Sequence, residues 1–249
     1  MYINFYRYCS YFFFILSFFL FITTTFFLFN CYQKKQFVEK SNNLYELNNE
    51  IFNKDLINYN NLKDFKNLVN IEVMKKNYTD LEIAFIIDNF IRSKFMHGKT
   101  PGKIKICENW LLYLVLPFFP NDLKFAVNPI DIIKNPNAFC NQQSIMFQNL
   151  LYDYDIQYGS VRFFTPPKGH FAVAAKIQNE WYFFDSNEEA NYNIKNPAKL
   201  EDVLNGNNNI FERLYPDRWF VDILKSGAKN NLIKLTDINS FPAKNALIF

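Results

Sequence analysis

Three side chains in one stretch of this chain could do chemistry together: the thiol of Cys140, the imidazole of His170 and the carboxylate of Asp185. The cysteine opens an apparent helix, the histidine opens an apparent strand, and the aspartate follows the next strand. These residue types match a thiol nucleophile, its general base, and a group that orients the base. The elements around them decide whether the three side chains can meet.

Cys140 lies between a loop-like segment, NPNAF, and an apolar-periodic segment, QQSIMFQNLLYDY. Positions 144, 147 and 151 share its helical face, and apolar residues at 146, 147, 150 and 151 predict a buried stripe. A thiol in the first helical turn lies at the positive end of the helix dipole, which favours the thiolate. The alternative is an inert buried cysteine, since a free cysteine also behaves as a small hydrophobic residue.

His170 and Asp185 flank a predicted β-hairpin, HFAVAAKI followed by EWYFFDS, which comes after a predicted strand YGSVRFF and a PPKG turn. If the intervening Gln-Asn pair forms a two-residue turn, Ile177 pairs with Glu180. Counting by twos then places His170 and Asp185 on one face as diagonal neighbours, within hydrogen-bonding reach. A shift of one residue would move Asp185 to the opposite face.

A helix is predicted to begin upstream at Thr79, because Thr79 and Glu82 form a capping box. Apolar residues at 83, 86, 87, 90 and 95 mark one face, and the helix is expected to stop at His97-Gly98. We expect His97, the other of the two histidines, to interact with the dipole of the helix C-terminus. The following run WLLYLVLPFFP is too short to cross a bilayer and is predicted to be buried in the domain.

The N-terminus contains an uncharged run at residues 11–29, YFFFILSFFLFITTTFFLF. Its length and hydropathy predict a transmembrane helix through a hydrocarbon core of ~30 Å. No small-x-small cleavage site follows, and Asn30 is a poor residue before a lipidated Cys31, so we expect an uncleaved single-pass anchor. The positive-inside rule leans toward a cytoplasmic domain, but the layout of short tail, single span and globular domain favours an extracytoplasmic one.

Composition removes several function classes. The net charge is +3 with acids and bases interspersed, which does not predict nucleic-acid binding. The four cysteines include no CxxC pair and predict neither a disulfide scaffold nor a zinc site. Cys, His and Asp could together bind zinc, but three ligands without a close pair fit thiol chemistry better. We expect no cofactor.

The block resembles the transglutaminase-like superfamily, a papain-like Cys-His-Asp group. NPIDIIKNPNAFC is similar to the lead-in to its nucleophile, QQSIMFQNLLYDYDIQYGSVRF to its helix and first strand, and GHFAVAAKIQNEWYFFDSN to its His-Asp hairpin, with Trp181 at the usual tryptophan position. The resemblance spans roughly residues 75–190. It implies that Cys140 is the nucleophile, His170 the general base and acid, and Asp185 the residue that orients the imidazole.

Two departures from the family pattern lie next to these residues. The family often has Gly before its cysteine, where this chain has Ala138-Phe139, and Pro after its aspartate, where this chain has Ser186. An oxyanion hole would include the backbone N–H of Cys140 at its helix start. Some family members add an upstream tryptophan, for which Trp110 is the candidate, with a place in the core as the alternative.

The expected fold is therefore α+β, with a papain-like, transglutaminase-like core in which a cysteine helix packs on an antiparallel sheet. The predicted parts are a membrane anchor (1–33), a stalk or peripheral helices (34–74), the core (75–190), and a C-terminal extension packed on the core (191–249). Within the extension, Pro197 and Gly206 predict the start and end of a short helix.

The predicted function is acyl transfer through a Cys140 thioester by a membrane-anchored enzyme acting on a peptide or protein amide. Hydrolysis is favoured over cross-linking to an amine, because it needs no second substrate site. Two alternatives remain: a non-catalytic transglutaminase-like binding module, or an accessory protein of cell-envelope or polysaccharide assembly that binds other envelope proteins.

Overall fold

The computed structural model describes residues 6, 8, 10–26, 29, 53–97, 126–166, 169–186 and 194–239. The chain divides into two compact units. Unit 1 comprises Met1–Asn48 and Ile104–Phe119, and unit 2 comprises Asn49–Lys103 and Pro120–Phe249. The predicted oxyanion candidate Trp110 and the apolar run around it lie outside the described residues.

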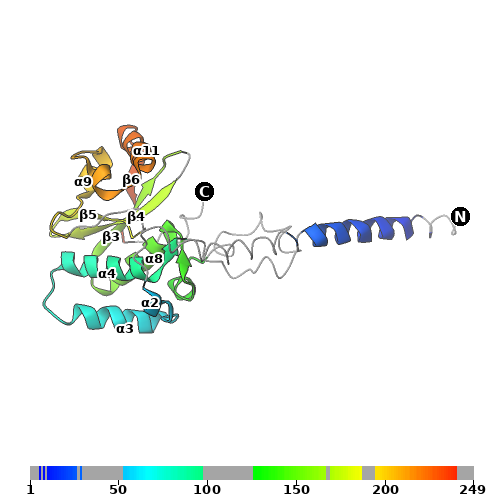
Figure 1. Cartoon of the computed structure of the whole chain (residues 1–249), viewed down its shortest axis with the longest axis horizontal. Coiled ribbons are helices and arrows are strands. Elements are labelled where there is room, and N and C mark those ends of the chain that lie inside the picture. The colour runs from blue at the N-terminus through cyan, green and yellow to red at the C-terminus, as the bar shows by residue number, and fades with distance from the viewer. Residues whose placement is uncertain are drawn as a thin grey trace. The chain divides into compact units, whose positions relative to one another are not determined.

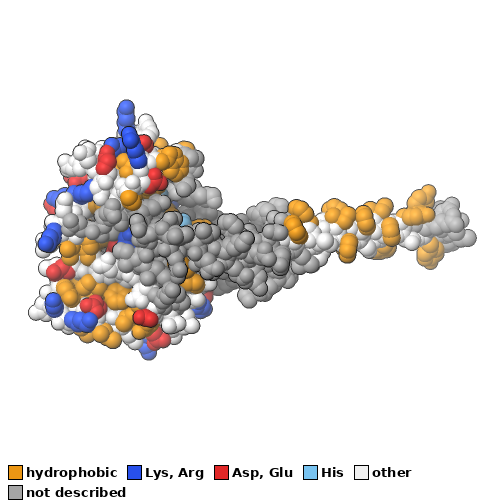
Figure 2. Space-filling view, viewed as in Figure 1, with side chains coloured by type: hydrophobic (Ala, Val, Ile, Leu, Met, Phe, Trp, Pro, Cys, Tyr) orange, Lys and Arg blue, Asp and Glu red, His pale blue; other side chains and the backbone are white. Residues whose placement is uncertain are grey.

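The described residues of unit 1, which are 6, 8, 10–26 and 29, are helical, and their aromatic and aliphatic side chains are exposed (Figures 1 and 2). Among the described residues, no helix combines the length and hydropathy needed to cross a membrane. The prediction of a single-pass anchor at 11–29 is therefore wrong, and the extracytoplasmic placement that rested on it loses its basis.

Unit 2 is a mixed α/β structure built on an antiparallel sheet, which agrees at this level with the predicted class. Four of its described strands form the sheet in the order β5-β4-β3-β6, and every neighbouring pair is antiparallel. The strands are β3 (Gln157–Phe163), β4 (His170–Ile177), β5 (Glu180–Phe184) and β6 (Ile233–Thr236).

The β4–β5 hairpin has the predicted register. Ile177 pairs with Glu180, and Val173 pairs with Phe184 at the other end of the ladder. The turn residues Gln178 (φ 51°) and Asn179 (φ 67°) both adopt the left-handed conformation that a two-residue hairpin turn demands. The ladder stops one residue before Asp185, so the backbone of Asp185 is not held by strand pairing.

Helices cover both faces of this sheet (Figure 1). Alternate residues of β4 enter two separate cores, with Val173 and Ile177 in one and Ala172 and Ala174 in the other. Because both faces are buried, β4 is an almost continuous apolar run and lacks the polar alternation of a half-exposed strand. The first core is covered by α3 (Leu62–Val73), α4 (Asp80–Lys94), α7 (Pro129–Ile132) and α8 (Cys140–Asp153), and α2 (Lys54–Ile57) packs against α4.

Helix α4 starts as predicted and ends early. Thr79 and Glu82 form the expected capping box, with the Thr79 amide 2.8 Å from the Glu82 carboxylate. The backbone turns extended at Phe95, so the prediction that the helix continues to His97 is wrong. His97 instead belongs to a two-residue strand and pairs with Ala138, two residues before the predicted nucleophile. The paired strands are β1 (Met96–His97) and β2 (Asn137–Ala138).

The second core is covered by the C-terminal part of unit 2. The predicted short helix begins at Leu200, later than Pro197, and ends at Gly206, whose φ of 67° is the left-handed cap that glycine favours. Two further helices follow and pack against Phe163 and Phe183 of the sheet. The helices of this layer are α9 (Leu200–Asn205), α10 (Ile210–Leu214) and α11 (Arg218–Lys229).

Candidate active site

Cys140 is the first residue of α8 and a free thiol, half-buried at the helix N-terminus. Two glutamines of the first helical turn hold the backbone segment that precedes Cys140. Gln142 accepts a hydrogen bond from the Phe139 amide (3.1 Å) and donates to the Ala126 carbonyl (2.8 Å). Gln143 donates to the Ala138 carbonyl (3.1 Å). The backbone around the thiol is therefore held on both sides of Phe139 without the glycine that the family pattern often has there.

His170 and Asp185 meet directly. His170 is the first residue of β4, Asp185 follows the last residue of β5, and Nε2 of the imidazole lies 2.6 Å from Oδ2 of the carboxylate. Both side chains are buried, with exposed fractions of 7% and 1%. The hairpin register brings them together as predicted, because continuing it past Val173–Phe184 puts Asp185 opposite Ala172, and His170 lies two residues further along the same face of β4.

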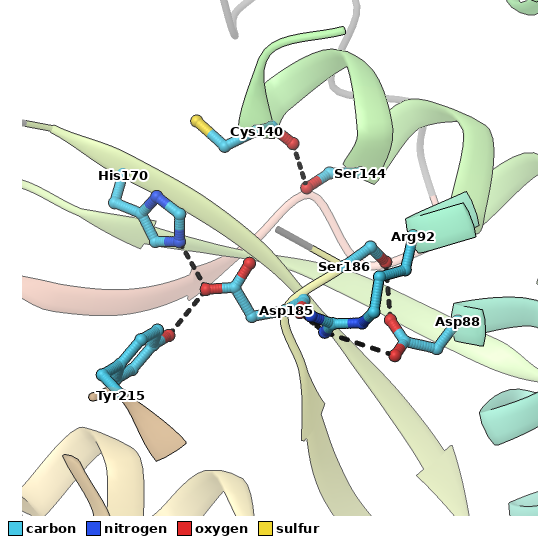
Figure 3. A network of polar contacts seen from close by, with 8 residues as sticks. All are labelled: Asp88, Arg92, Cys140, Ser144, His170, Asp185, Ser186 and Tyr215. Atoms are coloured by element: carbon cyan, nitrogen blue, oxygen red, sulfur yellow. Dashed lines mark hydrogen bonds and ion pairs between the residues drawn. The ribbon is translucent and has the colours of Figure 1, made fainter. Parts of the chain in front are cut away.

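Tyr215, at the end of α10, donates a second hydrogen bond to the same carboxylate oxygen, with its hydroxyl 2.6 Å from Asp185 Oδ2 (Figure 3). An ionised carboxylate only accepts, so His170 must donate through Nε2–H. In the neutral imidazole this leaves Nδ1 without a proton. Nδ1 is then the ring nitrogen that can take a proton from a thiol.

In Figure 3 the sulfur of Cys140 extends from α8 on the side of the network where the His170 imidazole lies. Burial lowers the pKa of His170, but the charge and hydrogen bond of Asp185, with a hydrogen bond and charge from Cys140, raise this pKa well above its ordinary value of 6.5. The protonated imidazole is therefore favoured between the thiol and the carboxylate. Such a cation stabilises a neighbouring thiolate.

Aromatic rings enclose the imidazole. The rings of Phe163 from β3 and Phe220 from α11 each have their centroid 5.4 Å from that of His170. Tyr215 packs edge-on against Phe220 at 5.1 Å. Since these rings exclude water, the interaction between His170 and Asp185 is stronger than it would be at an exposed site.

A second buried polar group lies behind Asp185. Arg92 of α4 donates through Nη2 to the Asp185 carbonyl and lies 3.5 Å from Asp88 Oδ2, while the Ser186 hydroxyl donates to Asp88 Oδ1 at 2.7 Å (Figure 3). Burial raises the pKa of Asp88, opposed by the charge of Arg92 and the Ser186 hydroxyl, and the nearby charge of Asp185 raises it further. The network therefore joins helix α4 to the residues just after β5.

The structure brings together the residues that sequence reasoning singled out and adds others that it missed. Arg92 and Asp88 had a usable signal, because two opposite charges lie one turn apart on the helix predicted from Thr79, beside its apolar residues. No sequence signal pointed to Tyr215 and Phe220, since they come from the C-terminal extension and reach the site only through tertiary packing. Among the described residues, no group of three His, Cys, Asp or Glu side chains is arranged to hold a metal ion.

No family model and no curated protein matches this chain. Among solved structures, the chain is similar to a candidate cysteine protease from Cytophaga hutchinsonii, at 14% sequence identity and a TM-score of 0.39. The similarity covers 79% of this chain and 50% of the other, so this chain spans about half the length of that protein. A TM-score this low supports no argument about activity, and the functional conclusion depends on the geometry of the site.

Proposed function

We propose that this chain is a cysteine hydrolase with a papain-like, transglutaminase-like core, in which Cys140, His170 and Asp185 act as a catalytic triad on an amide substrate. One observation carries the proposal: a buried His170–Asp185 hydrogen bond lies beside a free thiol at the first residue of a helix. This combination supplies a nucleophile, a base with a defined tautomer, and a group that stabilises the protonated base.

The mechanism follows from the proton positions. His170 Nδ1 takes the Sγ proton of Cys140, and the thiolate attacks the carbonyl carbon of the substrate. The backbone N–H of Cys140 precedes the helical hydrogen-bond ladder and would donate to the oxyanion that forms. His170 then gives its proton to the leaving amine, which leaves a thioester on Cys140.

A water molecule completes the cycle. Nδ1 takes a proton from water as its oxygen attacks the thioester carbonyl. The C–S bond then breaks and the proton passes from Nδ1 to Sγ, which regenerates the Cys140 thiol and releases a carboxylic acid. If a primary amine attacked in place of water, the product would be a new amide, as in cross-linking. We favour hydrolysis, because water needs no binding site of its own.

The test uses the full-length chain with p-nitrophenyl acetate, an activated ester that acylates reactive thiols. We expect a burst of p-nitrophenolate and an acetyl group on Cys140, located by peptide mass mapping because three other cysteines are present. Cys140→Ser should abolish the acetylated peptide, and His170→Ala should slow acylation by at least about 10²-fold, the usual contribution of a general base. Lys66→Ala, which removes an ion pair with Asp153 at the other end of α8 (2.7 Å), is the control and should retain the parental rate.

Two results would count against this function. Acylation spread over the other cysteines, or a Cys140 rate that is equal in the parent and in His170→Ala, would leave no role for the triad and would favour a binding module.

A second experiment, with an added primary amine such as putrescine, separates acyl transfer to water from acyl transfer to an amine. Release of free acetate supports hydrolysis, and N-acetylputrescine as the main product would replace hydrolysis with transfer.

A further inference from the structure

The residues directly after β5 need a support that the sheet does not provide. The β4–β5 ladder ends with Val173 and Phe184, so Asp185 and Ser186 lie beyond the last strand pairing. The Asp185 carboxylate must nevertheless be held to a few tenths of an ångström if it is to keep a 2.6 Å contact with His170. Something other than the sheet must fix this segment.

Helix α4 contacts this segment on both sides of one peptide bond. Arg92 donates to the carbonyl oxygen of Asp185, and Asp88 accepts from the hydroxyl of Ser186 at 2.7 Å. Asp88 and Arg92 are four residues apart, so they lie on the same face of α4, and they are paired with each other at 3.5 Å. The contacts close a ring that runs from Arg92 through Asp185, Ser186 and Asp88 back to Arg92 (Figure 3).

All of these side chains are buried, and Asp88 is 0% exposed. A buried ion pair contributes little net stability, because the cost of removing both charges from water offsets their attraction. A buried ion pair does, however, hold the groups that it contacts in a fixed geometry. An arginine suits this task, since Nη2 of its planar guanidinium donates to the Asp185 carbonyl and lies 3.5 Å from Asp88 Oδ2 as an ion pair, with a direction that a lysine ammonium fixes less well.

We propose that Arg92, Asp88 and Ser186 form a clamp that positions Asp185 against His170. Arg92 and Asp88 are thus positioning residues for the triad, acting from a helix outside the Cys-helix and His-Asp hairpin. The role of this clamp in catalysis rests on the proposed function. The groups that face His170 itself are Asp185, Cys140 and the aromatic rings of Phe163 and Phe220.

The test measures the pKa of His170 by NMR titration of ¹⁵N-histidine-labelled full-length chain, which is simple to interpret because the chain has only two histidines. His97→Gln assigns the signals. Arg92→Lys keeps the charge and loses the planar fork, and Ser186→Ala removes the hydroxyl. If the clamp positions Asp185, the pKa of His170 falls in both variants by about one unit or more, the effect expected when an opposite charge moves away. The pKa of His97 should not move.

Two controls separate positioning from general destabilisation. Ser186→Thr keeps a hydroxyl and should preserve the parental His170 titration. Arg162→Lys weakens another mostly buried Arg-carboxylate pair, Arg162 with Asp237 at 2.8 Å, and should lower stability without moving the His170 pKa. If Arg92→Lys fails to fold, the Ser186→Ala and Ser186→Thr pair decides alone.

An unchanged His170 pKa in folded Arg92→Lys and Ser186→Ala overturns the clamp. The same pKa shift in Arg162→Lys also overturns it, because the effect would then be one of stability. The readout needs no reactive thiol, so it is independent of the acylation test. Loss of acylation in the parent would refute the proposed function, whereas an unmoved His170 titration refutes the clamp.

Discussion

The hydroxyl of Tyr215 lies 2.6 Å from Oδ2 of Asp185, the same oxygen that accepts from His170. Two donors on one buried carboxylate oxygen fix the orientation of the carboxylate and the tautomer of the imidazole. They also share its negative charge, so Tyr215 competes with His170 for the same acceptor. This contact comes from the C-terminal layer of unit 2, which therefore takes part in the site as well as covering the sheet.

Tyr215→Phe should raise the pKa of His170 further, because the Asp185 carboxylate loses one of its donors and its charge then acts more strongly on the imidazolium. The free energy of unfolding should fall by about 1.5–3 kcal/mol for a lost hydrogen bond to a charged group. NMR titration and urea unfolding measure the two effects. Tyr154→Phe, which removes a longer contact to Asn70 (3.4 Å), is the matched control and should leave the His170 titration unchanged. A lower His170 pKa in Tyr215→Phe would mean that Tyr215 mainly holds the carboxylate in place.

Asp185→Asn should lower the pKa of His170, because the neutral amide no longer stabilises the imidazolium beside Cys140. We expect the rate of Cys140 alkylation by iodoacetamide at pH 6 to fall by at least about 10-fold, the effect of losing an opposite charge worth 1–3 pKa units. Near pH 10, where an ordinary thiol is also ionised, the rates should converge. Asp153→Asn, which weakens the Lys66–Asp153 ion pair at the other end of α8, should keep the parental profile. Superimposable profiles for Asp185→Asn and the parent would contradict the assigned role of Asp185.

The raised pKa of His170 also predicts how stability depends on pH. A folded-state pKa above the unfolded value means that the folded state binds the proton more tightly. The stabilisation of the folded state by protonated His170 is therefore fully present below pH ~6.5 and is lost as pH rises through the folded pKa. Within that window the free energy of unfolding should decrease by up to about 1.4 kcal/mol per pH unit. Urea unfolding of the parent and of His170→Gln between pH 6 and 9 measures the difference. Equal pH slopes in the two proteins would show that the pKa of His170 is not raised.

Gly227 of α11 allows that helix to approach the β3–β4 connection closely. A Cβ added at Gly227 would collide with the Cγ2 of Thr165, so Gly227→Ala should push α11 outward and cost about 1–3 kcal/mol of stability. Phe220 lies on the same helix, and we therefore expect looser packing around His170 and slower acylation of Cys140. Ser226→Ala, at an exposed neighbouring position, should change neither. An unaltered unfolding midpoint in Gly227→Ala would show that Thr165 moves aside without cost.

The sequence alone determined the local parts of the site. A two-residue Gln-Asn turn allows one register for the hairpin, so the relative positions of His170 and Asp185 follow from counting residues along the two strands. The capping box at Thr79 and the helix start at Cys140 are likewise local signals, since each depends on residues within one turn. Short-range geometry is encoded by neighbours in the chain.

Only the tertiary structure decided which distant side chains complete the site. Tyr215 and Phe220 reach Asp185 and His170 because α10 and α11 pack on the second face of the sheet, and their periodicity contains no information about that face. The path after α4 was also decided by packing, which turns Met96 and His97 into a strand beside the nucleophile. The anchor that hydropathy predicts at residues 11–29 is likewise contradicted, since among the described residues no helix has both the length and the hydropathy needed to cross a membrane. Local sequence sets turns and caps, whereas the free energy of burying distant surfaces sets which of them meet.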